Sequence, residues 1–340
     1  MASGWGWPVN TSGVVRALDE LGIEPVLVDL GASGEVFEVW RAIAGISVLV
    51  GFDPDSREMD RRSSDLFRTH HIIPRAVTAD ENPTATFYLT RSPFCSSTLE
   101  PDHESLEAYL MAPLFEVESE VSVPASTLGK ALEELGIDRV DWFKADTQGT
   151  DLRIFRSLPR SIRDGVLAVD VEPGLASTYR GEDLFVETHT YLTSQGFWLS
   201  RLRVKGSARM TGASKSELDM IDNADETGSE SHGVRESPVW CEARYLRTAA
   251  SLENREDRDW VLSWVFAMLD DQQGFALDLV RGLEHRSGGP ALASLMRQET
   301  IESVLRRREL PFLRRAWKRI VPTPLRKALF SARTWLSPDS

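Results

Sequence analysis

Two apolar runs separated by a turn of small residues constrain the fold of this chain most strongly. Val26–Leu30 leads into Gly31-Ala32-Ser33-Gly34, and a second run, Val48–Phe52, leads into Asp53. Short, continuous apolar runs are typical of strands buried on both faces of a parallel sheet. Small residues let the backbone close on a ligand after the first strand, and a carboxylate after the second can accept both hydroxyls of a ribose. The pattern predicts a nucleoside site at one edge of an α/β sheet.

The spacing of the glycines indicates which nucleoside fits. Gly31 and Gly34 do not follow the G-x-G-x-x-G pattern that holds a pyrophosphate. A ligand without phosphates suits this turn better, so we expect S-adenosylmethionine to be the cofactor. The alternative is that these glycines only let a helix pack closely against a strand.

Strand-like and helix-like segments alternate along the middle of the chain, which predicts a doubly wound, mostly parallel α/β sheet. We divide the chain into an N-terminal helical leader (1–25), this domain (26–247) and a helical extension (248–340). Residues 206–237 are rich in Ser, Gly, Asp and Glu, so we expect a mobile acidic loop there. We expect helices at 35–44, 124–135, 151–158 and 184–195, and strands at 26–30, 47–52, 71–77, 140–146, 165–172, 197–204 and 239–247.

The composition is that of a globular protein in a reducing compartment. Hydrophobic residues make up 41% of the 340 residues and charged residues 27%, which is enough apolar material for a sizeable core. The net charge of −13 argues against nucleic acid as a partner. Cys95 and Cys241 fit neither a disulfide framework nor a metal cluster. The chain shows no signal-peptide pattern and no run of roughly 20 apolar residues, so we expect a cytoplasmic protein.

The charge reverses near the C-terminus. Residues 304–333 hold ten Lys and Arg residues against one Glu, and Leu313, Trp317 and Ile320 fall on one helical face. A basic amphipathic helix of this kind can lie on anionic lipid, or it can dock on the acidic body of its own chain. Peripheral contact with a membrane through 304–333 is therefore one expectation for this segment, beside docking on its own chain and binding of an anionic polymer.

Three motifs taken together resemble the FkbM-type methyltransferases: Val28–Gly34, Gly51–Asp55 and Asp141–Asp151. Lys144, Asp146 and Gly149 carry the most specific part of this resemblance. It extends over residues 25–247 and implies a Rossmann-like class I methyltransferase fold with S-adenosylmethionine as cofactor. The resemblance also implies methylation of a hydroxyl oxygen.

The resemblance and the strand ends together give the expected cofactor-binding residues, which are Asp29, Gly31, Ser33, Gly34 and Asp53. Asp29 would meet the amino group of the methionine moiety, and Asp53 would accept the ribose hydroxyls. The family more often has Asn at position 33 and Glu at positions 53 and 151. Here Ser33 keeps a short polar side chain, and Asp53 and Asp151 keep the carboxylate.

Asp146, Glu172 and His189 are the candidate catalytic residues. Lys144 and Asp146 share one face of a strand, and Glu172 ends the strand that carries Asp170. A carboxylate or an imidazole near a hydroxyl acceptor can take its proton. Two of the three have a plainer alternative: Asp146 as an ion-pair partner of Lys144, and His189 as a packing residue. A divalent ion between Asp146 and Glu172 is possible, but no ligand-rich motif requires a metal, and we predict none.

The sequence thus predicts an S-adenosylmethionine-dependent O-methyltransferase that acts on a hydroxyl of a sugar, glycan or polyketide-like metabolite. The serine-rich loop Pro93–Thr98 is the expected cover over the acceptor. One alternative is a non-catalytic scaffold that keeps the fold and binds a glycan or is recruited to a membrane. A nicotinamide-dependent reductase is a second alternative, against which the missing G-x-G-x-x-G pattern weighs.

Overall fold

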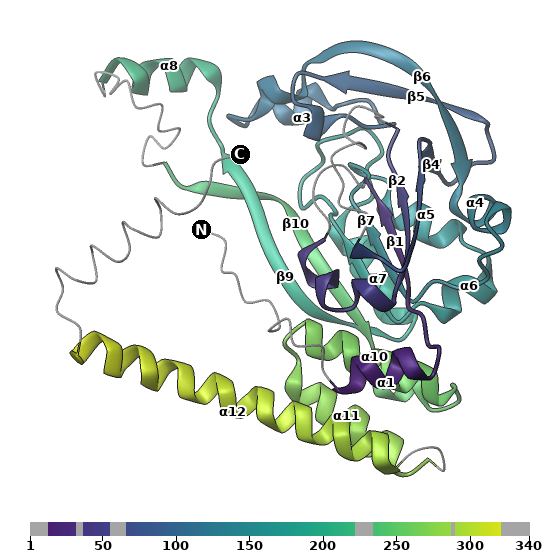
Figure 1. Ribbon diagram of the computed structural model, residues 1–340. Helices are drawn as coiled ribbons and strands as arrows, with labels where there is room; N and C mark the ends of the chain where they lie inside the picture. The colour runs from purple at the N-terminus through teal and green to yellow at the C-terminus, as the bar shows by residue number, and fades with distance from the viewer. Residues whose placement is uncertain (1–12, 32–36, 55–65, 222–233, 287–289, 321–340) are drawn as a thin grey trace.

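A seven-stranded mixed sheet forms the centre of the protein, as the computed structural model shows for residues 13–31, 37–54, 66–221, 234–286 and 290–320 (Figure 1). The strand order is β3-β2-β1-β7-β8-β10-β9. The first five strands in this order are parallel, and β10 and β9 are antiparallel to their neighbours. The strands are β1 (Val26–Leu30), β2 (Val48–Phe52), β3 (Thr69–Ile73), β7 (Trp142–Ala145), β8 (Ala168–Val171), β9 (Phe197–Ala208) and β10 (Glu236–Arg247). The predicted α/β class is confirmed.

One face of this sheet is apolar over its whole length. Val28, Val50 and Phe143 belong to a buried cluster on this face. Side chains from four helices complete the cluster: α4 (Leu128–Glu134), α5 (Asp151–Ser157), α6 (Arg160–Gly165) and α7 (Phe185–Ser194). Every second residue of a strand points to this side, so the continuous apolar runs of the sequence supply it directly.

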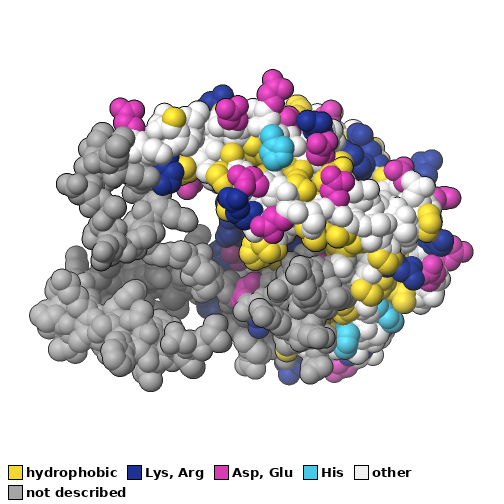
Figure 2. Space-filling model, turned by 90° about the horizontal axis from the view of Figure 1, so that it is seen from above, with side chains coloured by type: hydrophobic (Ala, Val, Ile, Leu, Met, Phe, Trp, Pro, Cys, Tyr) yellow, Lys and Arg dark blue, Asp and Glu magenta, His cyan; other side chains and the backbone are white. Residues whose placement is uncertain are grey.

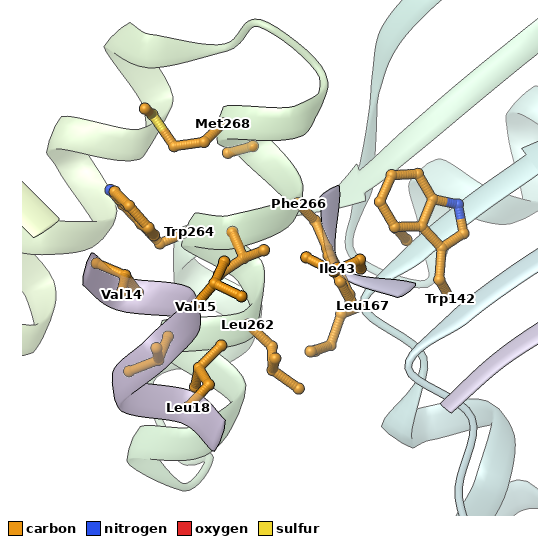
Figure 3. Close-up of a cluster of buried hydrophobic side chains, with 14 of the residues drawn as sticks. Val14, Val15, Leu18, Ile43, Trp142, Leu167, Leu262, Trp264, Phe266 and Met268 are labelled. Atoms are coloured by element: carbon orange, nitrogen blue, oxygen red, sulfur yellow. The ribbon is translucent and has the colours of Figure 1, made fainter. Parts of the chain in front are cut away.

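The other face is apolar only where the parallel strands begin. Leu27, Leu49 and Trp142 lie in a second buried cluster with the helices near both chain ends (Figure 3). These helices are α1 (Gly13–Glu20), α9 (Ala249–Leu252), α10 (Asp257–Leu269), α11 (Gln273–Glu284) and α12 (Pro290–Ile320). Two residues further along β1 and β7 the side chains on this face are Asp29 and Lys144. The face therefore changes from apolar to charged toward the carboxyl ends of the strands.

Specific hydrogen bonds fasten the outer helices to the sheet. Arg258 on α10 forms an ion pair with Asp141 at 2.7 Å, and Asp141 also accepts from the backbone N–H of Val26 at 2.8 Å. Trp264 of α10 donates to the hydroxyl of Thr300 on α12 at 2.9 Å. The segments predicted as leader, domain and extension thus share one core in the described part of the chain.

A small second sheet lies beyond the carboxyl ends of the parallel strands of the main sheet (Figure 1). It has the order β4-β6-β5, with β6 parallel to β4 and antiparallel to β5. Its strands are β4 (Ala76–Thr78), β5 (Thr84–Thr90) and β6 (Val117–Thr127), and the short helices η4 (Pro93–Cys95), α3 (His103–Leu106) and η5 (Ala112–Phe115) connect β5 to β6. This sheet is the roof over the strand ends.

Four predicted elements are wrong in part. The strand predicted at 71–77 is divided between β3 of the main sheet and β4 of the second sheet. Residues 124–127 belong to β6, and the helix starts only at Leu128, because the Thr127 hydroxyl accepts from the Lys130 N–H as an N-cap. Short 3₁₀ turns, η1 (Glu38–Ala42) and η2 (Ala44–Ile46), replace the described part of the helix predicted at 35–44. The expected loop 206–237 holds the ends of β9 and β10 and the helix α8 (Gly212–Ile221), which Thr211 caps by accepting from the Ser214 N–H.

The basic segment 304–333 lies only partly within the described residues. Backbone from 304 to 320 continues α12, and Arg307 pairs with Asp271 of the loop after α10. Residues 321–333 lie outside the described residues. No helix in the described ranges combines the length and the apolar character needed to cross a membrane.

Replacing Phe266 with Ala tests whether the helices after β10 fold as one unit with the sheet. The Phe266 ring is fully buried and lies 4.7 Å from the Trp142 ring of β7, centroid to centroid. Phe266→Ala should lower the free energy of unfolding by about 3–5 kcal/mol while the urea transition stays single. The control Val186→Ala, at a side chain 66% exposed, should change it by less than about 0.5 kcal/mol. A separate early transition in the Phe266 variant would contradict the shared core.

Candidate active site

A cavity of about 2160 Å³ opens at the carboxyl ends of β1, β2, β7 and β8. Its floor includes Gly31, Asp53, Asp146 and Glu172, one residue or turn from each of these strands. Its roof comes from the second sheet, the loop 92–98 and the extended ends of β9 and β10. On the face above it, apolar side chains lie between charged ones (Figure 2). Ligand pockets usually measure about 300–1,000 Å³, so this cavity has room for two ligands side by side.

Gly31 makes the floor of the cavity possible. It follows β1 with φ +75°, and its N–H donates to the Phe52 carbonyl of β2 at 3.1 Å. A Cβ at this position would lie 2.1 Å from the backbone oxygen of Asp146. Only glycine allows both the left-handed conformation and this contact between the ends of β1 and β7. The order of the strands reverses between β1 and β7, which is where open α/β sheets bind ligands.

A row of alternating charges crosses four strands just beneath this floor. Asp29, Lys144, Asp170 and Arg244 are neighbours in register on β1, β7, β8 and β10. Lys144 Nζ lies 2.7 Å from Asp29, and Arg244 Nε lies 2.8 Å from Asp170. Arg244 also reaches Asp270 at 2.8 Å. Each buried charge has a partner of opposite sign, which buried ions need.

The Lys144 ammonium keeps its charge inside the protein. Burial opposes the charged form, but the carboxylates of Asp29, Asp146 and Glu172 outweigh burial and raise the pKa of Lys144. The ring of Phe37 lies 5.5 Å from Nζ and adds a cation–π contact. Lys144 is therefore a fixed positive charge below the cavity floor.

Asp146 and Glu172 share the floor but differ in protonation. Burial, followed by repulsion from Asp151 and Asp29, raises the pKa of Asp146 to about 6, while Lys144 and a hydrogen bond from Gln148 limit the rise. Burial and repulsion from Asp146 raise the pKa of Glu172 to about 8. Two carboxyl groups with opposed protonation suit acid and base roles at one site. The pKa of Glu172 is the higher of the two, so Asp146 loses its proton at a lower pH than Glu172.

Asp151 does not line the cavity, and its carboxylate binds backbone groups instead. Its carboxylate accepts from the N–H of Thr147 at 2.9 Å and from the N–H of Glu172 at 2.8 Å. Thr147 Oγ1 donates to it as well, at 2.5 Å. One buried carboxylate thus ties the turn after β7 to the end of β8. This contact holds Asp146 and Glu172 at a constant spacing.

The structure brings together some of the predicted site residues and not others. Gly31, Asp53, Asp146 and Glu172 line the cavity, and Asp53 is 5% exposed directly after β2. Asp29 does not line it, because its side chain turns to Lys144 beneath the floor. Ser33 and Gly34 lie outside the described residues.

His189 lies on the opposite face of the sheet from the carboxyl groups. Its ring stacks on Phe185 at 5.5 Å, and Nδ1 lies 3.3 Å from the Tyr245 hydroxyl. Tyr245 belongs to the buried apolar cluster of that face. The structure therefore does not bring His189 to the cavity, since α7 packs on the side away from it.

Two further residues of the site were not singled out from the sequence. Gln148 lines the cavity and donates from Nε2 to Asp146 Oδ1 at 2.6 Å. The Tyr179 hydroxyl lies 3.0 Å from Gln148 Oε1 and 2.9 Å from the Cys95 carbonyl oxygen. Gln148 falls within a motif that carries the family resemblance and Tyr179 within the range 25–247 over which it extends, so that resemblance was the available signal.

The loop 92–98, which the sequence predicts as the cover over the acceptor, forms part of the cavity wall. Phe94 is 79% exposed at the rim, whereas Ser97 is buried and donates to the Gln148 carbonyl at 2.7 Å. Both cysteines are free, with Cys95 in this loop and Cys241 buried in β10. Among the residues that the structure describes, no group of three or more His, Cys, Asp or Glu side chains could hold a metal ion.

A doubly wound sheet with a carboxylate-lined cavity at its switch point places the chain among α/β proteins that bind ligands at the strand ends. The model of the methyltransferase FkbM domain matches residues 31–199, and this part of the chain belongs to that domain family. The match begins at the Gly31 turn and ends within β9, so it includes every floor residue named above. No curated protein sequence matches the chain.

Replacing Gly31 with Ala should damage the fold at the cavity floor. The methyl group would meet the Asp146 backbone oxygen, so the ends of β1 and β7 must separate. Gly22 is a matched control, because its φ is +65° but a Cβ there would meet no atom within 4 Å. Gly22→Ala should cost about 1 kcal/mol of unfolding free energy from backbone strain alone, and Gly31→Ala at least about 2 kcal/mol more. Equal losses in urea titrations would contradict the importance of this contact.

Glu172 should make the protein less stable as the pH rises. Its pKa is about 8 in the folded protein against 4.5 in the unfolded chain, so the folded state holds an extra proton between these values. The unfolding free energy contributed by Glu172 therefore falls with increasing pH across this window. Glu172→Gln should therefore stabilise the protein more at pH 8.5 than at pH 5. Measured by thermal unfolding, its gain in unfolding free energy over the natural chain should be at least about 1 kcal/mol larger at pH 8.5. Asp138→Asn, at an exposed side chain, controls for loss of one carboxylate. A pH-independent difference would contradict this effect.

Proposed function

We propose that the chain is an S-adenosylmethionine-dependent O-methyltransferase whose acceptor is a hydroxyl of a sugar, glycan or polyketide-like metabolite. The observation that carries this proposal is the meeting of Gly31, Asp53, Asp146 and Glu172 around one cavity. The match to a methyltransferase domain over the same residues supports it. Methyl transfer needs a donor and an acceptor in one enclosed place, and the cavity is large enough for both.

The cavity floor suits a nucleoside with a positively charged group. Gly31 lets the ends of β1 and β7 come together at the floor, since a Cβ there would meet the Asp146 backbone oxygen, and Asp53 places a buried carboxylate after β2. Two carboxylate oxygens match the two hydroxyl donors of a ribose. When bound, S-adenosylmethionine supplies a methyl group that its sulfonium already activates. The protein then has to bind, orient and desolvate the two ligands.

The two carboxyl groups of the floor have separate tasks in this proposal. Methylation of a hydroxyl releases one proton, and the Asp146 carboxylate can accept it. Glu172, whose pKa is the higher of the two, can donate a hydrogen bond to the acceptor in its protonated form and hold it in place. Lys144 beneath them helps to keep Asp146 ionised. Asp29 supports the site indirectly, through its ion pair with Lys144.

Calorimetric titration with S-adenosylmethionine, S-adenosylhomocysteine and NADH tests the cofactor. Both adenosyl compounds should bind in saturable fashion and NADH should not. Asp53→Ala should weaken both by roughly 10- to 100-fold, since hydrogen bonds to a charged group contribute about 1.5–3 kcal/mol. Asp138→Ala removes the same charge from an exposed site and should leave the affinities unchanged.

Other results would point to the alternatives. Binding of NADH alone would favour a reductase. No binding of any of the three would favour a scaffold that keeps the fold without the chemistry.

A further inference from the structure

Gln148 has an unusual backbone for its residue type. Its φ is +56°, and among non-glycine residues in the described ranges only Asp271 shares a positive φ. A side chain in the left-handed region is strained, and such strain persists only where surrounding contacts hold it. At Gln148 these contacts are made by the side-chain amide and by the backbone carbonyl.

The side chain and backbone of Gln148 bind three different parts of the site. Nε2 donates to Asp146 Oδ1 at 2.6 Å, and Oε1 lies 3.0 Å from the Tyr179 hydroxyl. The backbone carbonyl accepts from Ser97 Oγ at 2.7 Å. Asp146 belongs to the floor, Ser97 to the loop 92–98 and Tyr179 to the segment after β8. One residue therefore connects the floor of the cavity to its wall.

Tyr179 extends this connection to the same loop a second time. Its hydroxyl lies 2.9 Å from the Cys95 carbonyl and 3.0 Å from Gln148 Oε1, and both oxygens are acceptors. A phenol has a single proton, so it can donate to only one of them at a time. The ring is 2% exposed and packs 5.6 Å from that of Phe115, centroid to centroid. This packing keeps the hydroxyl between the loop and the Gln148 amide.

We propose that Gln148 is a positioning residue: it orients the Asp146 carboxylate in the cavity and, through Tyr179 and Ser97, ties that carboxylate to the loop 92–98. This inference rests on the proposed function, because it concerns the carboxylate assigned there as proton acceptor. The amide must present its NH₂ group to Asp146, since the reverse orientation would set two acceptors against each other.

The charges around Asp146 show why a neutral donor matters at this position. Charged groups on three elements change the pKa of Asp146: Lys144 on β7 lowers it, and Asp151 on α5 and Asp29 on β1 raise it. Glu172 after β8, and Cys95 and Tyr179 at the wall, also face Asp146, whose charge raises their pKa values. Lys144 is the one cation among these groups. Gln148 lowers the pKa of Asp146 without adding another charge. Its removal should therefore raise the pH at which Asp146 ionises.

The test compares binding of S-adenosylmethionine and S-adenosylhomocysteine by calorimetry from pH 5 to 9. The first is a sulfonium cation and the second a neutral thioether, so an ionised Asp146 near the sulfur favours the first. The ratio of their dissociation constants should change with pH as Asp146 ionises. Asp146→Asn supplies the baseline, since it cannot ionise.

Gln148→Leu should move the midpoint of this change upward by at least about 0.5 pH unit, because the donor to Asp146 is lost. Tyr179→Phe keeps the ring and the Gln148 side chain but loses the hydroxyl. It should give a smaller upward shift, together with faster hydrogen exchange in residues 92–98. Gln298→Leu on α12 is the matched control, since that amide also donates to a carboxylate, Glu302, at 2.9 Å, and it should leave the midpoint unchanged.

The outcomes separate this inference from the proposed function. An unchanged midpoint in both folded variants, with a clear pH effect in the natural chain, would overturn the role of Gln148 alone. A ratio that is flat with pH in the natural chain would overturn the role of Asp146 beside the reacting groups in the proposed function, and this inference with it. Should Gln148→Leu fail to fold, Tyr179→Phe alone provides the test. An upward shift of its midpoint supports the role of Gln148, and an unchanged midpoint overturns it.

Discussion

The close approach of β1 to β7 is the constraint on which the rest of the site depends. Gly31 lies against the backbone of Asp146, and the Asp146 N–H donates to the Leu30 carbonyl at 3.0 Å. Because the chain continues to opposite sides of the sheet from these two strands, their ends leave a gap for a ligand. The cavity floor, the position of Asp146 and the route of the following turn all start from this contact.

Beneath that floor the protein stabilises charges that would otherwise oppose folding. The row Asp29, Lys144, Asp170 and Arg244 alternates in sign from strand to strand, so each carboxylate lies between or beside cations. Glu172 does not belong to this row, and its raised pKa reflects a carboxyl group kept where burial and Asp146 disfavour its charge. A group held against its own preference is typical of a functional site. The ionised form of Glu172 is destabilised by burial and by Asp146, whereas Asp170 has Arg244 as an ion-pair partner.

Particular segments show how far the sequence could be interpreted. Val26–Leu30 and Val48–Phe52 were predicted as buried strands because short, mainly apolar runs suit a sheet covered on both faces. Strand β6 was missed, although Val117, Val121 and Val123 alternate with Glu and Ser residues, because Pro124 and the following apolar spacing suggested a helix. Its partners β5 and β4 are supplied by other parts of the chain, and that pairing has no local signal.

The sequence by itself determined the sheet, the glycine turn and the carboxylates at the strand ends, because period-two patterning and strand–turn order are local properties. Only the tertiary structure decided which carboxylates face the cavity. Asp29 turned to Lys144 through cross-strand register, and His189 went to the far face with α7. The same holds for Gln148 and Tyr179, whose 31-residue separation is closed by a hydrogen bond. Distances across strands depend on packing and register, which no single segment encodes.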